Sequence, residues 1–191
     1  MANHNCRLWR YLRSASLIAP TLLAACCPSS LYRGDGGIAS ESCWPFIHYN
    51  VEFASVSTGT AQSRKYSIHR VPDFDVNPYA GVSLTTPRPL YCEQFKRSSA
   101  MKAVVALRLT SASGQDIAKY RAALSEWDWE HGVPPNPPRP WEPEKCLLSS
   151  RSLNLNPQNL HDLTLQITIE QPGESPIEVT PYVKSSIMYF P

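Results

Sequence analysis

Proline is the residue type that most limits how this chain can fold. The 191 residues include 18 prolines, nearly twice the average share, spread from residue 20 to residue 191. A proline inside a helix removes a backbone hydrogen bond and clashes with the preceding turn, so long helices cannot dominate. Charged residues make up only 18% of the chain, below the usual quarter. Together these features exclude a coiled coil and argue against a helical bundle.

Several segments show the period-two alternation of half-buried strands instead. The clearest covers residues 163–169, and a turn-like stretch at 171–175 followed by a new alternation predicts a hairpin there. A last strand is expected from Tyr182 to Phe190, with Pro181 at a bend or a sheet edge. The apolar members of the alternating runs are Tyr49, Val51 and Phe53; Tyr66 and Ile68; Ala103, Val105, Leu107 and Leu109; Leu163, Leu165, Ile167 and Ile169; and Ile177 and Val179.

One segment has the spacing of a helix. Residues 113–116 resemble a capping box, and Ile117, Tyr120, Leu124 and Trp127 follow at intervals of three, four and three. This spacing predicts one amphipathic helix that covers a sheet. The expected fold is therefore mainly β (α+β): an antiparallel sheet or small β-sandwich with one amphipathic helix and a loop rich in proline and tryptophan.

The N-terminus has the layout of a bacterial export signal. The first 34 residues contain no acidic side chain, and Arg7, Arg10 and Arg13 precede an apolar run from Ala15 to Leu23. Pro20 interrupts this run, which is shorter than the roughly 20 apolar residues that span a bilayer. We therefore expect residues 1–25 to be removed as a signal peptide.

Leu23-Ala24-Ala25-Cys26 resembles the lipobox of bacterial lipoproteins. In that class the cysteine is acylated and becomes the first residue of the mature protein, so the resemblance implies a lipid anchor on Cys26. Because residue 27 is not aspartate, the resemblance favours the outer membrane, with the domain facing the periplasm. It covers residues 1–26 only. It predicts a lipidated cysteine and flexible tether at 26–42 and a single β-rich domain at 43–191.

Cleavage also changes the charge of the chain. Without Arg7, Arg10 and Arg13, the protein has 15 basic and 16 acidic residues, a formal charge of −1. Neutralising the phosphates of a nucleic acid requires a basic surface, and this balance does not supply one. Nucleic acid is therefore not an expected partner.

The cysteine count fits an oxidising compartment. Apart from Cys6 in the signal and Cys26, four cysteines remain: Cys27, Cys43, Cys92 and Cys146. Proximity in sequence favours a Cys27–Cys43 bridge, which leaves Cys92 to pair with Cys146. A single bridge among Cys43, Cys92 and Cys146 is the alternative. No two of the four have zinc-ligand spacing, so no metal site is expected.

The segment from Trp127 to Cys146 is the most distinctive stretch of the chain. It holds six of the 18 prolines and three of the five tryptophans. Consecutive prolines favour an extended backbone, and tryptophans offer wide, rigid contact area. The sequence therefore predicts a partner-binding surface, unless the tryptophans fold back as packing elements. The candidate contact residues are Trp129, Glu130, Trp141, Glu142 and Glu144.

No motif identifies a reaction. The histidines after the signal, His48, His69, His131 and His161, lie in no metal-binding helix pattern, and no serine lies in a Gly-x-Ser-x-Gly elbow. Asp73 to Asn77 has the first spacing of a calcium loop, but the glycine and glutamate that complete that loop are missing. We expect a protein with neither catalytic residues nor a cofactor.

The size and organisation resemble those of lipoproteins that serve as adaptors of envelope machines or as immunity proteins against periplasmic toxins. This resemblance implies that the chain binds another protein. The alternative is a glycan-binding or hydrolytic lipoprotein of the cell envelope, in which the aromatic loop is a sugar platform.

Overall fold

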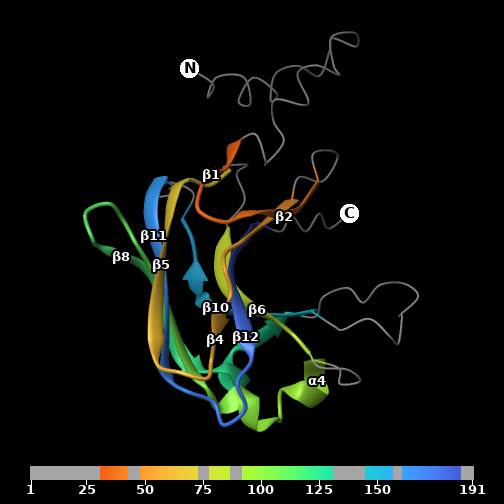
Figure 1. The fold of residues 1–191 in the computed structure, drawn as a ribbon. Coiled ribbons are helices and arrows are strands. Elements are labelled where there is room, and N and C mark those ends of the chain that lie inside the picture. The colour runs from red at the N-terminus through yellow and green to blue at the C-terminus, as the bar shows by residue number, and fades with distance from the viewer. Residues whose placement is uncertain are drawn as a thin grey trace, which may run out of the picture.

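The computed structural model describes residues 31–42, 48–72, 78–86, 92–130, 145–156 and 161–185. Within them, two antiparallel sheets face each other as a β-sandwich (Figure 1). The fold class predicted from the sequence, a mainly β chain with antiparallel sheets, is confirmed. Among these residues, helical structure is limited to short pieces.

The five-stranded sheet has the order β1-β5-β11-β7-β8. Its edges are β1 and β8, and β11 pairs with β5 on one side and β7 on the other. The bounds are β1 Arg33–Gly34, β5 Gln62–Arg70, β7 Val104–Thr110, β8 Asp116–Ala123 and β11 His161–Gln171.

The seven-stranded sheet has the order β2-β3-β12-β6-β10-β9, and β4 pairs with β12 off this path. Short helices connect β6 to β7 and β8 to β9. The strands are β2 Gly37–Ser42, β3 His48–Glu52, β4 Val56–Ser57, β6 Tyr79–Thr85, β9 Asp128–Glu130, β10 Lys145–Asn154 and β12 Glu178–Ser185; the helices are α4 Cys92–Phe95, η3 Ser99–Lys102 and η4 Leu124–Glu126.

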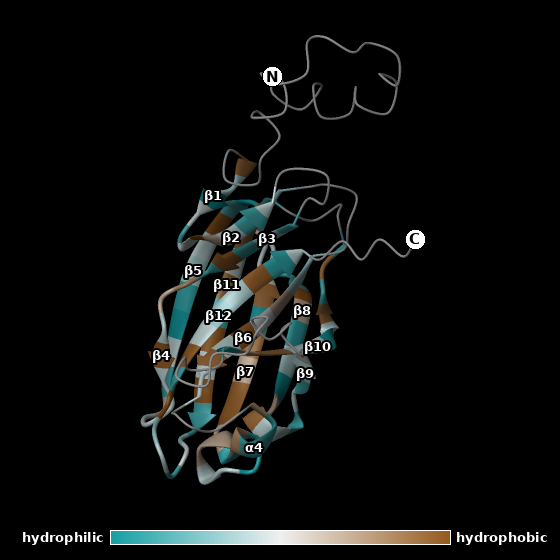
Figure 2. Ribbon diagram, turned by 90° about the vertical axis from the view of Figure 1, so that its right-hand side faces the viewer, coloured by the Kyte–Doolittle hydropathy of each residue, from teal (hydrophilic) through white to brown (hydrophobic). Residues whose placement is uncertain are grey.

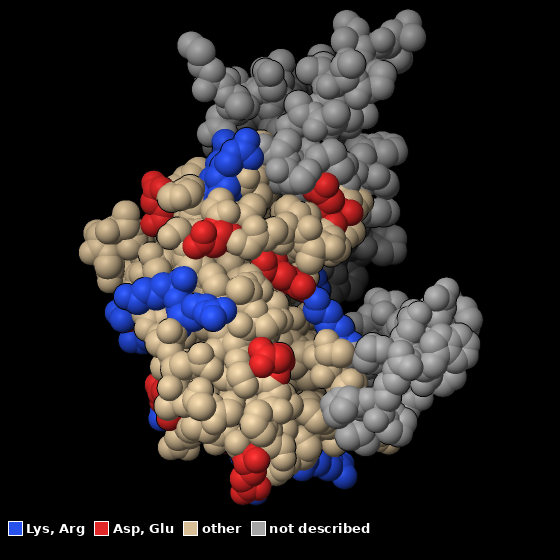
Figure 3. All heavy atoms as spheres, viewed as in Figure 1, with Lys and Arg blue, Asp and Glu red and all other residues tan. Residues whose placement is uncertain are grey.

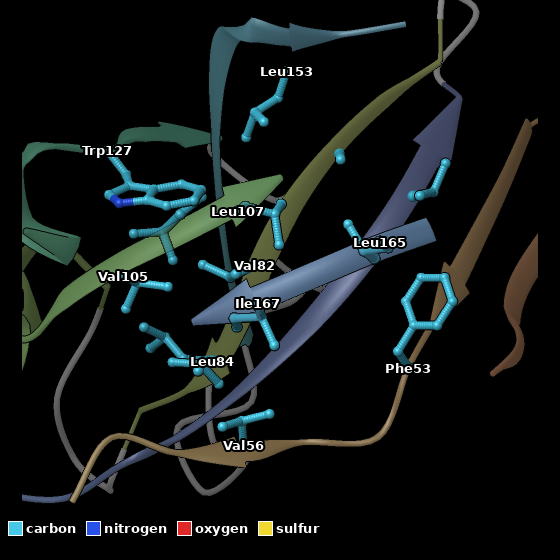
Figure 4. Close-up of a cluster of buried hydrophobic side chains, with 14 of the residues drawn as sticks. Phe53, Val56, Val82, Leu84, Val105, Leu107, Trp127, Leu153, Leu165 and Ile167 are labelled. Atoms are coloured by element: carbon cyan, nitrogen blue, oxygen red, sulfur yellow. The ribbon is translucent and has the colours of Figure 1, made fainter. Parts of the chain in front are cut away.

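The core lies between the two sheets. Hydrophobic residues lie along β6 in one sheet and β7 in the other (Figure 2), and side chains from both sheets interdigitate (Figure 4). Burial of this apolar surface is the main stabilising contribution of such a sandwich. The labelled core residues are Phe53, Val56, Val82, Leu84, Val105, Leu107, Trp127, Leu153, Leu165 and Ile167, all at most 4% exposed.

The strands predicted from alternation are present. The apolar residues of 163–169 are buried on β11, and Val105, Leu107 and Leu109 are buried on β7. The runs around Tyr49 and Tyr66 form β3 and β5. Period-two alternation is therefore a reliable signal here, because each of these strands buries one face in the core.

The amphipathic helix predicted over 113–127 is wrong. Asp116–Ala123 is the edge strand β8, and it pairs with β7. Ala118, Tyr120 and Ala122 lie on its inner face, opposite Leu109, Leu107 and Val105 in register. Pairing with β7 outweighs the local helix propensity of this segment.

The residues interpreted as a capping box form the β7–β8 turn. The backbone N–H of Ser111 donates to the carbonyl of Gln115 at 2.9 Å, and the N–H of Gly114 donates to the carbonyl of Ser111 at 2.9 Å. Gly114 has φ +82°, a conformation that favours glycine. Serine and glycine are common in helix caps and in tight turns alike, which explains the misinterpretation.

The hairpin predicted at 171–175 is also wrong. β11 belongs to the five-stranded sheet and β12 to the seven-stranded one, so the connection crosses between sheets. The N–H of Gly173 donates to the carbonyl of Thr58 at 3.1 Å, and the N–H of Thr58 donates to the carbonyl of Ile177 at 2.9 Å. These bonds fix the crossing segment to the residues that follow β4.

Pro181 lies inside a sheet and not at a bend or an edge. It is opposite Val82 of β6, and its carbonyl accepts the N–H of Phe53 at 3.0 Å. The backbone nitrogen and carbonyl oxygen of a strand residue point to the same side of the strand. The nitrogen of Pro181, which carries no hydrogen, therefore faces the gap between β3 and β4, as its carbonyl does. A proline fits here because the ladder is already broken on that side.

The tether predicted over 26–42 is too long, because β1 and β2 lie within it. β2 pairs with β3, and β1 pairs with β5. The carboxylate of Asp35 accepts the N–H of Ser67 at 2.7 Å, and the hydroxyl of Tyr32 donates to the carbonyl of Asp35. The folded domain therefore begins about ten residues earlier than its sequence predicts.

The phenol of Tyr32 makes the stability of the protein depend on pH in the alkaline range. Burial, together with the charge of Asp35, raises the pKa of Tyr32 from 10.0 to about 12, and burial raises the pKa of Tyr66 despite its contact with Arg64. Between pH 10.0 and about 12, Tyr32 of the unfolded chain has lost its proton whereas Tyr32 of the folded chain retains it. The free energy of unfolding therefore falls as the pH rises from 10.0 to about 12.

Urea unfolding at pH 8 and pH 11 measures this loss. We expect Tyr32→Phe to lose less stability between the two pH values than the unmodified protein does, because phenylalanine has no proton to release. An equal loss in both proteins would show that Tyr32 is not responsible.

Candidate functional site

The loop from Trp127 to Cys146, predicted to bind a partner, includes β9 and the start of β10, which flank residues 131–144. β9 and β10 are antiparallel, with Glu130 opposite Leu147 and Trp129 opposite Leu148. β10 also pairs with β6 along its other edge, so the strands that flank residues 131–144 both belong to the seven-stranded sheet.

A disulfide fixes the same place. Cys92 at the start of α4 is bonded to Cys146 at the start of β10, with the two Cα atoms 5.7 Å apart. This pair was predicted from the cysteine count, and the structure confirms it. Cys146 is 1% exposed. We call the paired ends of β9 and β10 together with the Cys92–Cys146 bridge the clamp.

The predicted contact residues differ in where they lie. Trp129 is half-buried against the core, and Glu130 is the last residue of β9. Trp141, Glu142 and Glu144 lie outside the described residues, as do Cys26, Cys27 and Cys43. The structure therefore describes the base of the predicted surface.

The side chain of Trp129 has two features unusual for a packing residue. The Lys96 ammonium lies 5.7 Å from the centre of its ring, within the range of a cation–π interaction. Its indole N–H is buried and has no hydrogen-bond partner among the described residues. A buried donor of this kind is costly unless a partner group accepts its hydrogen bond.

Trp127, in contrast, is a packing residue. It is 1% exposed, its indole N–H donates to the carbonyl of Ala122 at 3.4 Å, and its ring meets that of Tyr120 edge to face at 5.0 Å. Of the two described tryptophans beside the segment, one is therefore core and the other lies at the boundary.

One of the described histidines forms an ion pair at the surface. His69 Nδ1 lies 3.6 Å from a carboxylate oxygen of Asp162, with both side chains about two-thirds exposed. Within the same residues, no three histidine, cysteine, aspartate or glutamate side chains are close enough to hold a metal ion. None of the described helices has the length and apolar character needed to cross a membrane.

A polar hollow of about 370 Å³ lies away from the clamp. It is formed where the β7–β8 turn meets the end of β10 and the start of β11, and His161 and Asp116 contribute to its wall. Sequence reasoning noted His161 but missed the other residues, because they come from three separate segments and share no motif. The full lining is Ser111, Gln115, Asp116, Ile117, Asn154, Asn156 and His161.

Asp116 is held in its ionised form. A hydrogen bond from the guanidinium of Arg108 is the main cause of its lowered pKa, and the ammonium of Lys119, 3.4 Å away, acts in the same direction.

On the face shown in Figure 3, the charged residues are interspersed among uncharged ones. The described surface in this view has no broad area of one sign.

The chain matches no protein-family model, and no curated protein matches it.

Proposed function

We propose that this chain is a lipid-anchored protein of the bacterial outer membrane whose periplasmic domain binds another protein, without enzymatic activity. The binding surface is the segment 131–144 together with Trp129, which is presented by the clamp. The partner is a toxin that the chain neutralises or a subunit of an envelope machine, and its identity separates an immunity protein from an adaptor.

The observation that carries the proposal is the clamp itself. A binding segment loses less conformational entropy on association when its ends are already fixed. Here β9–β10 pairing fixes both ends, and the Cys92–Cys146 bridge joins the start of β10 to α4. The segment between them contains six prolines, which further restrict its backbone.

The position of the anchor supports the same surface. Cys26 lies seven residues before β1, so the chain between them spans at most about 25 Å. β1 lies at one end of the sandwich, and α4, which carries Cys92 of the clamp, lies at the other (Figure 1). A domain tethered at Cys26 would therefore hold its β1 end near the membrane and its clamp toward the periplasm.

Capture of the partner tests the proposal. Full-length protein in detergent is incubated with envelope and secreted extracts, beside a Trp141→Ala/Glu142→Gln/Glu144→Gln variant. A Glu174→Gln/Glu178→Gln variant removes the same number of charges elsewhere. We expect one stoichiometric partner with the unmodified and the Glu174/Glu178 proteins and its loss from the first variant. Equal capture by all three would contradict the proposed surface.

The anchor gives a separate prediction. Cys26→Ser should abolish acylation and release the domain from the membrane fraction, because the cysteine sulfur is the atom that would carry the lipid. Cell fractionation and the mass of the mature N-terminus check this. Unchanged partition into the membrane, with an unchanged N-terminal mass, would contradict the lipoprotein assignment.

A further inference from the structure

The polar hollow has the chemistry of a site for uncharged, hydroxyl-rich ligands. Its wall contains side-chain amides from Gln115 and Asn154, each with a donor and an acceptor group. Neither amide makes a hydrogen bond to another described residue. Both side chains are exposed, so these groups are accessible from solvent.

Asp116 supplies the one carboxylate among the residues that line the hollow, and it is already paired with cations. The carboxylate of Asp116 faces two cations, Arg108 on β7 and Lys119 on β8. It can still accept hydrogen bonds through its remaining lone pairs, since a carboxylate has about four acceptor positions. A cationic ligand therefore gains little from Asp116, and no lysine or arginine lines the hollow to bind an anionic one. Hydroxyl groups, in contrast, find acceptors and donors together.

The size and polarity of the hollow favour a small polar group over an apolar side chain. A volume of about 370 Å³ is at the lower end of the range for ligand sites. Ile117 is its one apolar lining residue, which leaves no pocket for the apolar side chains by which peptides are usually selected. One or two sugar rings fit both the size and the polarity.

We propose that this hollow binds a one- or two-ring segment of a neutral saccharide through Gln115, Asp116, Asn154 and His161. The site is independent of the protein-binding surface, because it lies at the Asn154 end of β10 and the clamp lies at the Cys146 end. His161 is opposite Arg70, which also pairs with β1, so the hollow lies at the same end of the sandwich as β1.

Saturation-transfer NMR tests this with cellobiose, maltose and N,N′-diacetylchitobiose as probes. Full-length protein is kept in a detergent without a sugar headgroup. The test variant is Gln115→Ala/Asn154→Ala, whose two exposed side chains leave the core unchanged. The control is Gln171→Ala, an exposed amide at the opposite end of β11 from His161.

We expect transfer to at least one disaccharide, with affinity lower by on the order of tenfold in the double variant because two hydrogen-bonding groups are lost. The control variant should match the unmodified protein. No transfer to any probe, or equal transfer with all three proteins, would overturn the proposal. Competition between trialanine and a disaccharide for Gln115 and Asn154 would also overturn the proposal, since the hollow would then be a peptide site.

Discussion

Replacing Trp127 by alanine should lower the free energy of unfolding by about 3–5 kcal/mol, the usual cost of removing a large buried aromatic side chain. Trp127 is 1% exposed and lies between the sheets, with its ring edge to face on Tyr120 (Figure 4). Truncation removes this contact and leaves a cavity that a close-packed interior fills only in part.

Urea unfolding of Trp127→Ala and Trp129→Ala compares the two tryptophans directly. Trp129 is only half-buried, so its truncation should cost less than that of Trp127. A loss below about 1 kcal/mol for Trp127→Ala would contradict its role as a core residue. It would instead favour a surface role for both tryptophans.

The second large effect is expected from the clamp. Cys92 and Cys146 are 54 residues apart in sequence, and closing a loop of this length restricts the unfolded chain by roughly 4 kcal/mol. Cys92→Ala/Cys146→Ala should therefore lose about that much stability under oxidising conditions. Alanine is chosen over serine because position 146 is buried and a serine hydroxyl there would need a partner.

Unmodified protein under reducing conditions is the matched comparison for this variant. A loss equal to that of the double variant indicates that the Cys92–Cys146 bridge accounts for the whole disulfide contribution. A larger loss indicates a second bridge, as predicted between Cys27 and Cys43. Full stability of the double variant would contradict the stabilising role of the clamp.

Most of the fold could be predicted from residues that alternate strongly. β11 is the clearest case, because Leu163, Leu165 and Ile167 face the core and their neighbours face solvent. β8 was missed because its inner face consists of Ala118, Tyr120 and Ala122, and alanine gives a weak apolar signal that also suits a helix. The crossing from β11 to β12 could not be read locally, since a turn and a crossover begin with the same residues.

One part of the candidate site could be predicted from the sequence and another part could not. The number and position of the cysteines favoured the Cys92–Cys146 pair, although they left a single bridge among Cys43, Cys92 and Cys146 open as the alternative. The hollow could not be predicted, because Gln115, Asn154 and His161 meet only after three segments have folded. Polar side chains of this kind have no periodicity that would separate them from ordinary surface residues.

The measurement that tests the central claim most directly is crosslinking in intact cells. A photoreactive phenylalanine analogue is placed at position 141, in the segment held by the clamp, and at position 174, a control on the β11–β12 connection. We predict one crosslinked protein from position 141 and none of the same mass from position 174. No adduct at position 141, or the same adducts from both positions, would contradict a partner-binding role for this segment.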